Sequence, residues 1–172
     1  DRALVTTYMA TFGVIMSCAI GFTVGTLCFQ SKRAAAFMLG VCDIFQTFPS
    51  FVYLIPVMML FGITDTSVLI AVIVYATIPA TRYTIEGLRS VPAGLHDAAT
   101  MSGVNKFQRL TKIEFPLAFP HMMLGLNQTI VFALFMVIIG AFIGTEDLGQ
   151  YILKALSDLS LIHISEPTRR LN

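Results

Sequence analysis

Long apolar segments separated by shorter polar ones make up most of the chain. The core of a bilayer is about 30 Å thick, and a helix needs about 20 apolar residues to cross it. The first apolar segment, residues 4–29, easily reaches this length. The same pattern predicts further crossings at about 44–61, 67–81 and 121–143. We therefore expect an all-α transmembrane fold in which this chain supplies four membrane helices.

The second apolar segment, residues 34–61, is too long for one straight crossing, and Pro49 and Pro56 interrupt it. We place the crossing at 44–61 and expect 34–42 to be an interfacial or slanted approach to it. Polar residues in this segment follow one another at spacings of three, four and three, which places them on one side of a helix. These residues are Asp43, Gln46, Ser50 and Tyr53.

Polar side chains at membrane depth face a protein interior or an aqueous path. The four residues are therefore candidates for a translocation path, and the alternative is that they bond to neighbouring helices or to carbonyls freed by the prolines. Asn127 and Gln128 pose the same question, because two buried amides need partners on another helix or along the path. Gly21 and Gly25 form a GxxxG pattern, for which we expect packing within the subunit.

A long polar passage, residues 83–120, separates the third and fourth crossings and predicts two short helices joined at a glycine. Pro92 suits the start of the first helix, and Gly103 can adopt the positive φ that ends it. Pro116 and Pro120 should stop or bend the second helix before the next apolar segment begins. The passage predicts either a docking surface for a partner or an amphipathic helix at the membrane interface.

Composition supports a membrane protein. Of the 172 residues, 56% are hydrophobic and 12% are charged, and the mean hydropathy is +0.79. A typical soluble domain has about 25% charged residues. The net charge of +1 gives no indication of a nucleic-acid partner, so the informative property is where the charges fall.

The distribution of charge predicts the orientation in the membrane. Cations gather on one side of the predicted helices: Lys32, Arg33, Arg82, Arg89, Lys106, Arg109 and Lys112. The loops at 62–66 and 144–150 carry acidic residues and no cation, and Arg2 is the exception on that side. By the positive-inside rule, we expect loop 83–120 to be cytoplasmic.

The sequence offers no catalytic, metal or cofactor motif. Cys18, Cys28 and Cys42 lack the spacing of metal or redox sites, and we expect them to be small buried residues. His96 and His121 have no evident Ser or Cys partner, so ordinary roles at a surface or helix end are expected. No Gly-rich loop ending in Gly-Lys-Ser/Thr is present, and ATP hydrolysis by this chain is not expected.

Residues of the polar passage stand at a recognisable spacing: Asp97, Ala98, Ala99, Gly103, Ile113 and Pro116. This spacing resembles the cytoplasmic EAA loop of ABC importer permeases, whose pattern is E-A-A, three residues, G, nine residues, I-x-L-P. Asp97 stands where the family usually has Glu, and Phe115 stands where it has Leu. Two further stretches, QTFPSFVYLIP at 46–56 and GLNQT at 125–129, resemble the glycine betaine/proline (quaternary amine) permeases.

The resemblance implies a type I ABC importer permease core (MetI-like), with four of about five core helices present. It implies that the six residues of the EAA-like pattern couple the permease to two cytoplasmic ATPase subunits. A second permease subunit, forming a homodimer, and an extracytoplasmic substrate-binding protein or domain would complete the system in a prokaryotic inner membrane. The implied cargo is glycine betaine, proline or a related compatible solute taken up for osmoprotection.

Two alternatives remain open at this point. One is a permease of the same superfamily with another small cargo, such as methionine. The other, from a different class, is a secondary transporter or channel that works without ATPase subunits.

The two ends of the sequence have unusual features. The chain starts at Asp1 rather than Met, and LSLIHISEPTR at 159–169 resembles the translation of a transposase sequencing adapter. We therefore expect residues 1–158 to be one transmembrane domain truncated at both ends, and 159–172 to be an artefact. On this view, 151–158 begins a fifth helix that is lost.

Overall fold

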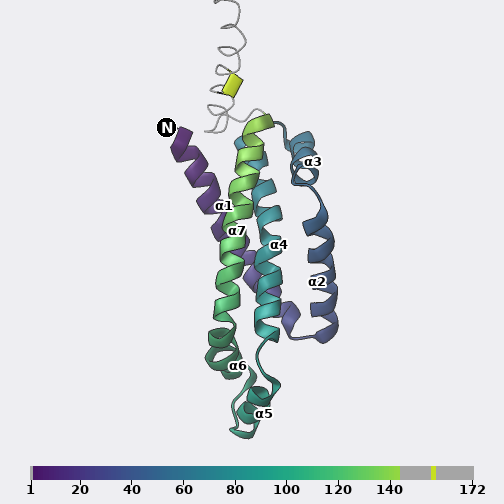
Figure 1. The fold of residues 1–172 in the computed structure, drawn as a ribbon, viewed down its shortest axis with the longest axis vertical. Coiled ribbons are helices and arrows are strands. Elements are labelled where there is room, and N and C mark those ends of the chain that lie inside the picture. The colour runs from purple at the N-terminus through teal and green to yellow at the C-terminus, as the bar shows by residue number, and fades with distance from the viewer. Residues whose placement is uncertain (1, 144–155, 158–172) are drawn as a thin grey trace, which may run out of the picture.

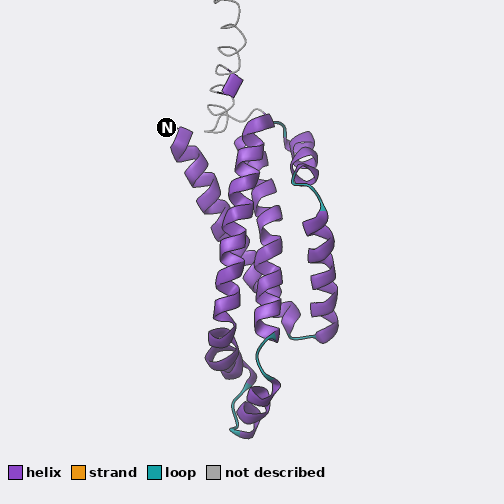
Figure 2. Cartoon of the chain, viewed as in Figure 1, coloured by secondary structure: helices purple, strands orange, loops and turns teal. Residues whose placement is uncertain are grey.

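A computed structural model describes residues 2–143 and 156–157, and the regular elements in this part of the chain are all helical (Figure 1, Figure 2). Three expectations fall outside the described residues: the acidic loop at 144–150, most of the fifth-helix start at 151–158, and the adapter-like sequence at 159–169. The elements in chain order are α1 (Arg2–Phe29), α2 (Lys32–Thr47), α3 (Phe51–Phe61), α4 (Asp65–Arg89), α5 (Ala93–Met101), α6 (Lys106–Arg109), the π-helical turn η1 (Leu110–Glu114) and α7 (Phe115–Ile143).

Helix α4 is the centre of the fold, with α1 and α7 packed along its length and α2 and α3 beside it (Figure 1). Small residues permit this close approach. A Cβ atom added at Gly25 would lie 2.7 Å from the Cβ of Thr84, and one added at Gly140 would lie 2.7 Å from Cγ2 of Val68. Since Gly25 and Gly21 both face α4 of the same chain, the expected packing of the GxxxG pattern within the subunit is confirmed.

The apolar helices agree with an all-α membrane fold. Among the described residues, three helical stretches are long and apolar enough to cross a bilayer: Leu4–Phe29, Asp65–Arg89 and Lys106–Ile143. The pair α2 and α3 passes the same test when its two helices are taken together, although it is bent by 85°. Residues 2–143 thus contain up to four spans, as the hydropathy pattern predicts, but several of their bounds differ.

The predicted crossing at 44–61 is wrong as a single helix, because the chain breaks between α2 and α3. Pro49 has no N–H to donate to the carbonyl of Phe45, and it disfavours helical geometry in the residue before it. Phe48 accordingly has an extended backbone, with φ −76° and ψ 138°. Residues 34–42, for which we expected an interfacial or slanted approach, form part of the regular helix α2.

The polar passage is shorter than its predicted bounds of 83–120. Helix α4 continues to Arg89 with Pro79 inside it, and α7 runs from Phe115 through Pro120 to Ile143. The expected stop of the second helix ahead of the fourth crossing is therefore wrong, because the helical stretch continues from Lys106 to Ile143. Prolines persist in membrane helices where neighbouring packing holds the backbone, and here buried side chains hold it: Leu88, Ala118 and Met122 pack together.

Candidate functional site

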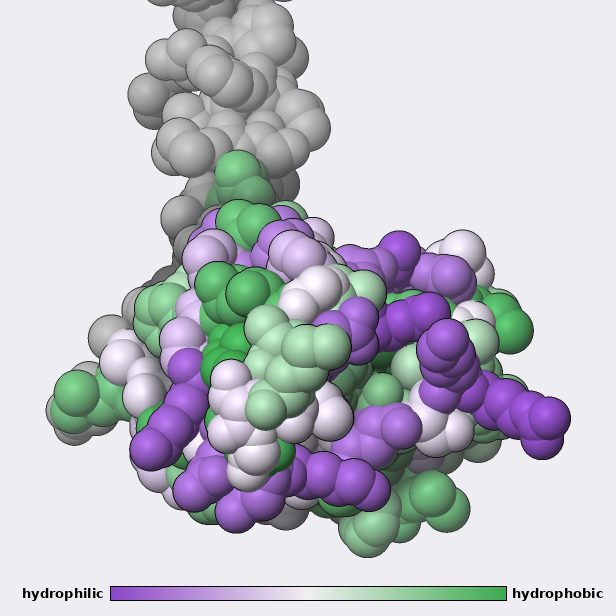
Figure 3. All heavy atoms as spheres, turned by 90° about the horizontal axis from the view of Figure 1, so that it is seen from below, coloured by the Kyte–Doolittle hydropathy of each residue, from purple (hydrophilic) through white to green (hydrophobic). Residues whose placement is uncertain are grey.

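The start of α2, the end of α4, and α5 and α6 all lie at the same end of the molecule (Figure 1). Six of the seven cations singled out in the sequence are on these segments or on η1: Lys32, Arg33, Arg89, Lys106, Arg109 and Lys112. Figure 3 looks onto this end and shows hydrophilic side chains around more apolar ones. We call it the polar end, and the charge pattern read from the sequence corresponds to one physical surface.

The passage between α4 and α7 folds as the short helix α5 and, beyond a glycine turn, the helical turns α6 and η1, which run on into α7. The first short helix and the glycine junction are as predicted, whereas the second helix is not separate from the fourth crossing. Helix α5 follows Pro92, and Gly103 has the positive φ, 70°, that reverses the chain after it. The N–H of Val104 donates to the carbonyl of Ala99 across this turn, at 3.1 Å. Asn105 then caps α6 in a reciprocal capping box with Gln108. From α6 the chain continues through η1 into α7.

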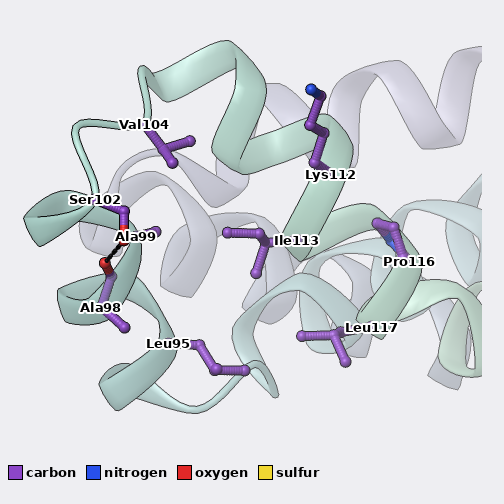
Figure 4. Close-up of a pocket in the computed structure, with 9 residues that line it drawn as sticks. All are labelled: Leu95, Ala98, Ala99, Ser102, Val104, Lys112, Ile113, Pro116 and Leu117. Atoms are coloured by element: carbon purple, nitrogen blue, oxygen red, sulfur yellow. Dashed lines mark hydrogen bonds between the residues drawn. The ribbon is translucent and has the colours of Figure 1, made fainter.

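An open, mainly apolar hollow of about 510 Å³ lies between α5 and the start of α7 (Figure 4). Its lining comes from both sides of the glycine turn: Leu95, Ala98, Ala99, Ser102, Val104, Lys112, Ile113, Pro116 and Leu117. Four of the six residues of the EAA-like pattern are among them, although up to 18 positions separate them in sequence. We call this hollow the α5 hollow; it brings the two halves of the pattern together.

The other two residues of the pattern contribute differently. Gly103 forms the turn between the halves, while Asp97 is exposed on α5 and does not line the hollow. Within residues 2–143 and 156–157, Asp97 makes no ion pair or side-chain hydrogen bond. Its carboxylate is therefore available to a group outside the chain.

Glu114 is the residue of this region that the sequence reading did not single out. Its side chain is 2% exposed, and its Oε1 lies 2.9 Å from Nε of Arg109 and 3.1 Å from Nδ1 of His96. A signal was present in the sequence, since an acidic residue stands between the apolar Ile113 and Phe115 at the start of a membrane helix. Its two partners, however, could be identified only from the fold.

The predicted path residues Asp43 and Gln46 contact a single cation. Arg82 on α4 pairs with Asp43 and donates to Oε1 of Gln46 at 3.0 Å, and its Nε donates to Glu86 at 3.0 Å. Both residues of α2 thus bond to a neighbouring helix, which is one of the alternatives that the sequence left open. A role along a translocation path stays a proposal.

Ser50 lies in the break between α2 and α3, and Tyr53 lies beyond it, so the four polar residues do not share one side of a single helix. The O–H of the buried Tyr53 donates to the carbonyl of Phe45. In an unbroken helix this carbonyl would accept from residue 49, which is proline and has no N–H. Tyr53 therefore satisfies a carbonyl that Pro49 leaves free.

The two amides of α7, Asn127 and Gln128, differ in how far the chain covers them. Helix α7 packs on the rest of the chain through a face that includes Gly125, Thr129 and Ala133, spaced four residues apart. Asn127 lies off this face and is exposed, and Gln128 is half-buried. Neither amide hydrogen-bonds within the described part of the chain. Both are therefore available to bond to a helix of another subunit or to line a translocation path.

A profile of the family described as "Binding-protein-dependent transport system inner membrane component" matches residues 12–164. The chain belongs to this family. It is 89% identical over 158 residues to the trimethylamine N-oxide transport system permease protein TmoV of Pelagibacter ubique, covering 92% of this chain and 22% of that protein. It is 46% identical to TmoV of Ruegeria pomeroyi, covering 94% of this chain and 24% of the relative.

Further relatives and structures agree on the family and fold. Identity is 38% to the glycine betaine/proline betaine transport system permease protein ProW of Escherichia coli, covering 94% of this chain and 46% of ProW. The chain thus spans less than half of each of these three relatives. Two crystal forms of the inward-facing MetNI methionine ABC transporter match with TM-scores of 0.71 and 0.76, at 20% and 21% identity, covering 87% of this chain and 76% of theirs. The expected MetI-like permease fold is confirmed.

Proposed function

We propose that the chain is a membrane-spanning permease segment of an ATP-driven importer and that it docks cytoplasmic ATPase subunits through the α5 hollow. The observation that carries this proposal is the meeting of the two halves of the EAA-like pattern at one apolar hollow on the polar end. On this proposal the polar end faces the cytoplasm, in line with its cations. A second permease subunit and an extracytoplasmic binding protein or domain complete the assembly.

The shape and chemistry of the α5 hollow fit a protein partner. Ala98 and Ala99 add little bulk, so a partner can come close to the backbone of α5, while Leu95 and Ile113 supply apolar contact area. Lys112 at the rim and the exposed carboxylate of Asp97 can orient that contact by charge. An apolar centre with charged groups around it is the usual composition of a specific protein interface.

We further propose that the cargo is trimethylamine N-oxide, the solute named for two of the relatives above. Glycine betaine is the second candidate, because the next relative carries it in its name. Both solutes are small and neutral overall and contain a trimethylated nitrogen, so one pathway could accept either. Selection between them would rest largely with the binding protein.

The docking test uses the permease co-expressed with its ATPase subunit, in full-length form. Ala99→Arg places a cation where the native side chain is 5% exposed, and Gly103→Pro imposes a negative φ where the backbone has 70°. Both changes should abolish co-purification of the ATPase while leaving membrane insertion intact. Gly94→Ala is the matched control, because a Cβ there meets no atom within 4 Å. Retention of the ATPase by both variants would show that the α5 hollow is not the interface.

The same complex with its binding protein tests the cargo. Uptake of labelled trimethylamine N-oxide should be competed by the unlabelled solute, more weakly by glycine betaine, and not by methionine. Uptake should also stop when the ATPase carries a substitution of its phosphate-binding lysine. Uptake that continues in that variant would favour a secondary transporter or channel.

A further inference from the structure

Glu114 is a buried carboxylate held between three elements of the polar end. It closes η1, and its two partners come from α5 and α6: His96 Nδ1 at 3.1 Å and Arg109 Nε at 2.9 Å. The side chain of Glu114 is 2% exposed, whereas those of its partners are 28% and 31% exposed. A buried charge is costly unless it is paired, so this cluster fixes the relative positions of the elements that supply it.

The π-helical turn is what aims Glu114 at this cluster. Arg109 and Glu114 are five residues apart, and in a regular α-helix two such side chains would point about 140° away from each other. In η1 the N–H of Phe115 bonds to the carbonyl of Leu110, five residues back, so the turn is wider. The wider turn brings Glu114 over Arg109 and towards α5.

His96 supplies the link from the other side. Helix α5 stands apart from the bundle, and its backbone has no extensive contact with another helix (Figure 1). Its other side-chain hydrogen bonds return to its own carbonyls: Thr100 donates to His96, and Ser102 donates to Ala98. Within the described part of the chain, the contact of His96 with Glu114 is therefore the polar side-chain link between α5 and the element that enters the membrane.

The helix beyond Glu114 leads directly into the core. Residues Lys106–Ile143 form one apolar helical stretch of 38 residues, and α7 packs along α4. We propose that Glu114 is a positioning residue that fastens α5 to α7 through His96, so that a displacement of α5 moves α7. This inference rests on the ATPase docking proposed above. Without the link, no polar side-chain contact among the described residues would join α5 to that helix, and the two loops that flank α5 could absorb the displacement.

The test separates docking from transmission. The permease, its ATPase subunits and its binding protein are reconstituted in proteoliposomes, and trimethylamine N-oxide uptake and ATP hydrolysis are measured together. His96→Ala removes the link but leaves Glu114 paired with Arg109, so the buried charge keeps a partner. We expect His96→Ala to keep its ATPase while the solute transported per ATP falls about fivefold or more. His96→Lys should restore the ratio, because a lysine can pair with the same carboxylate.

Two further variants complete the design. Glu114→Gln should lower the ratio as His96→Ala does, since it removes the charge from the other side of the link. Lys106→Gln removes one cation from the same region, outside the cluster and the α5 hollow, and should leave the ratio unchanged. If His96→Ala retains its ATPase and transports as much solute per ATP as the unmodified permease, the role of Glu114 is overturned, while the docking proposal stands. Equal loss in His96→Ala and His96→Lys would also overturn it, because only packing would then matter. Failure of the unmodified permease to retain its ATPase would overturn the docking proposal, and this inference with it.

Discussion

The hydrogen bond from Tyr53 to the carbonyl of Phe45 predicts a measurable energetic coupling between substitutions at Tyr53 and at Pro49. Tyr53→Phe removes the O–H and leaves that carbonyl without a donor, because Pro49 has none to offer. Tyr53 is 7% exposed, and surrounding lipid cannot replace the lost donor as water would. An unsatisfied buried acceptor costs about 1–3 kcal/mol.

We expect Tyr53→Phe to lower the free energy of unfolding by about 2 kcal/mol. For a chain of this size, this loss lowers Tm by about 4–8 °C. Pro49→Ala supplies a backbone N–H at the position from which a helix would satisfy Phe45. In the Pro49→Ala background, Tyr53→Phe should therefore cost less than about half as much, giving a clear coupling in a double-mutant cycle. Thermal unfolding of the four proteins in detergent, followed by circular dichroism, measures this coupling.

Tyr8→Phe is the control, because the same atom is removed from a residue that is 60% exposed. Its effect should stay within about 0.5 kcal/mol. Equal costs of Tyr53→Phe with and without Pro49 would refute the reasoning, since the phenol would then stabilise something other than the carbonyl that the proline leaves free.

Two further predictions concern the packing of α1 and α2 on α4. Gly25→Ala should destabilise the protein by about 1–3 kcal/mol, because its Cβ would meet that of Thr84 at 2.7 Å. Gly40→Ala, where a Cβ meets no atom within 4 Å, should not lower Tm in the same unfolding assay, and equal losses would contradict the packing argument. Arg82→Gln should loosen the contact of α2 with α4, because α2 buries only two of its own side chains. Cys42 on α2 is 3% exposed, so this loosening should speed the labelling of its thiol. The buried cysteine of α1 serves as the reference thiol, and an unchanged ratio of the two labelling rates would show that the Arg82 cluster does not hold α2.

Local patterns predicted most of the membrane architecture. Hydropathy alone placed α1 and the cores of α4 and α7, because a helix that crosses a bilayer must carry its apolar residues in one continuous stretch. The turn at Gly103 could be predicted for a similar reason, since only the local backbone decides where a positive φ is needed. The errors fell at prolines, whose effect depends on the packing around them.

The two proline outcomes show this difference. Pro49 broke the helix and the chain bent by 85°, whereas Pro120 stayed inside α7. Sequence spacing therefore misplaced the polar residues around Pro49 on one helical side, although the residues themselves were identified. Likewise, the spacing of the EAA-like pattern was visible, but the α5 hollow that joins Ala98 and Ile113 exists only after the chain reverses at the glycine.

The sequence by itself determined an all-helical membrane protein with a cationic end that carries the EAA-like pattern. These properties follow from composition, hydropathy and spacing, which act along the chain. Tertiary structure alone decided that Arg82 meets Asp43, that Asn127 faces outwards and that Glu114 links His96 to Arg109. A charge inside a protein must find a partner wherever the fold brings one near, and that partner has no fixed distance in the sequence.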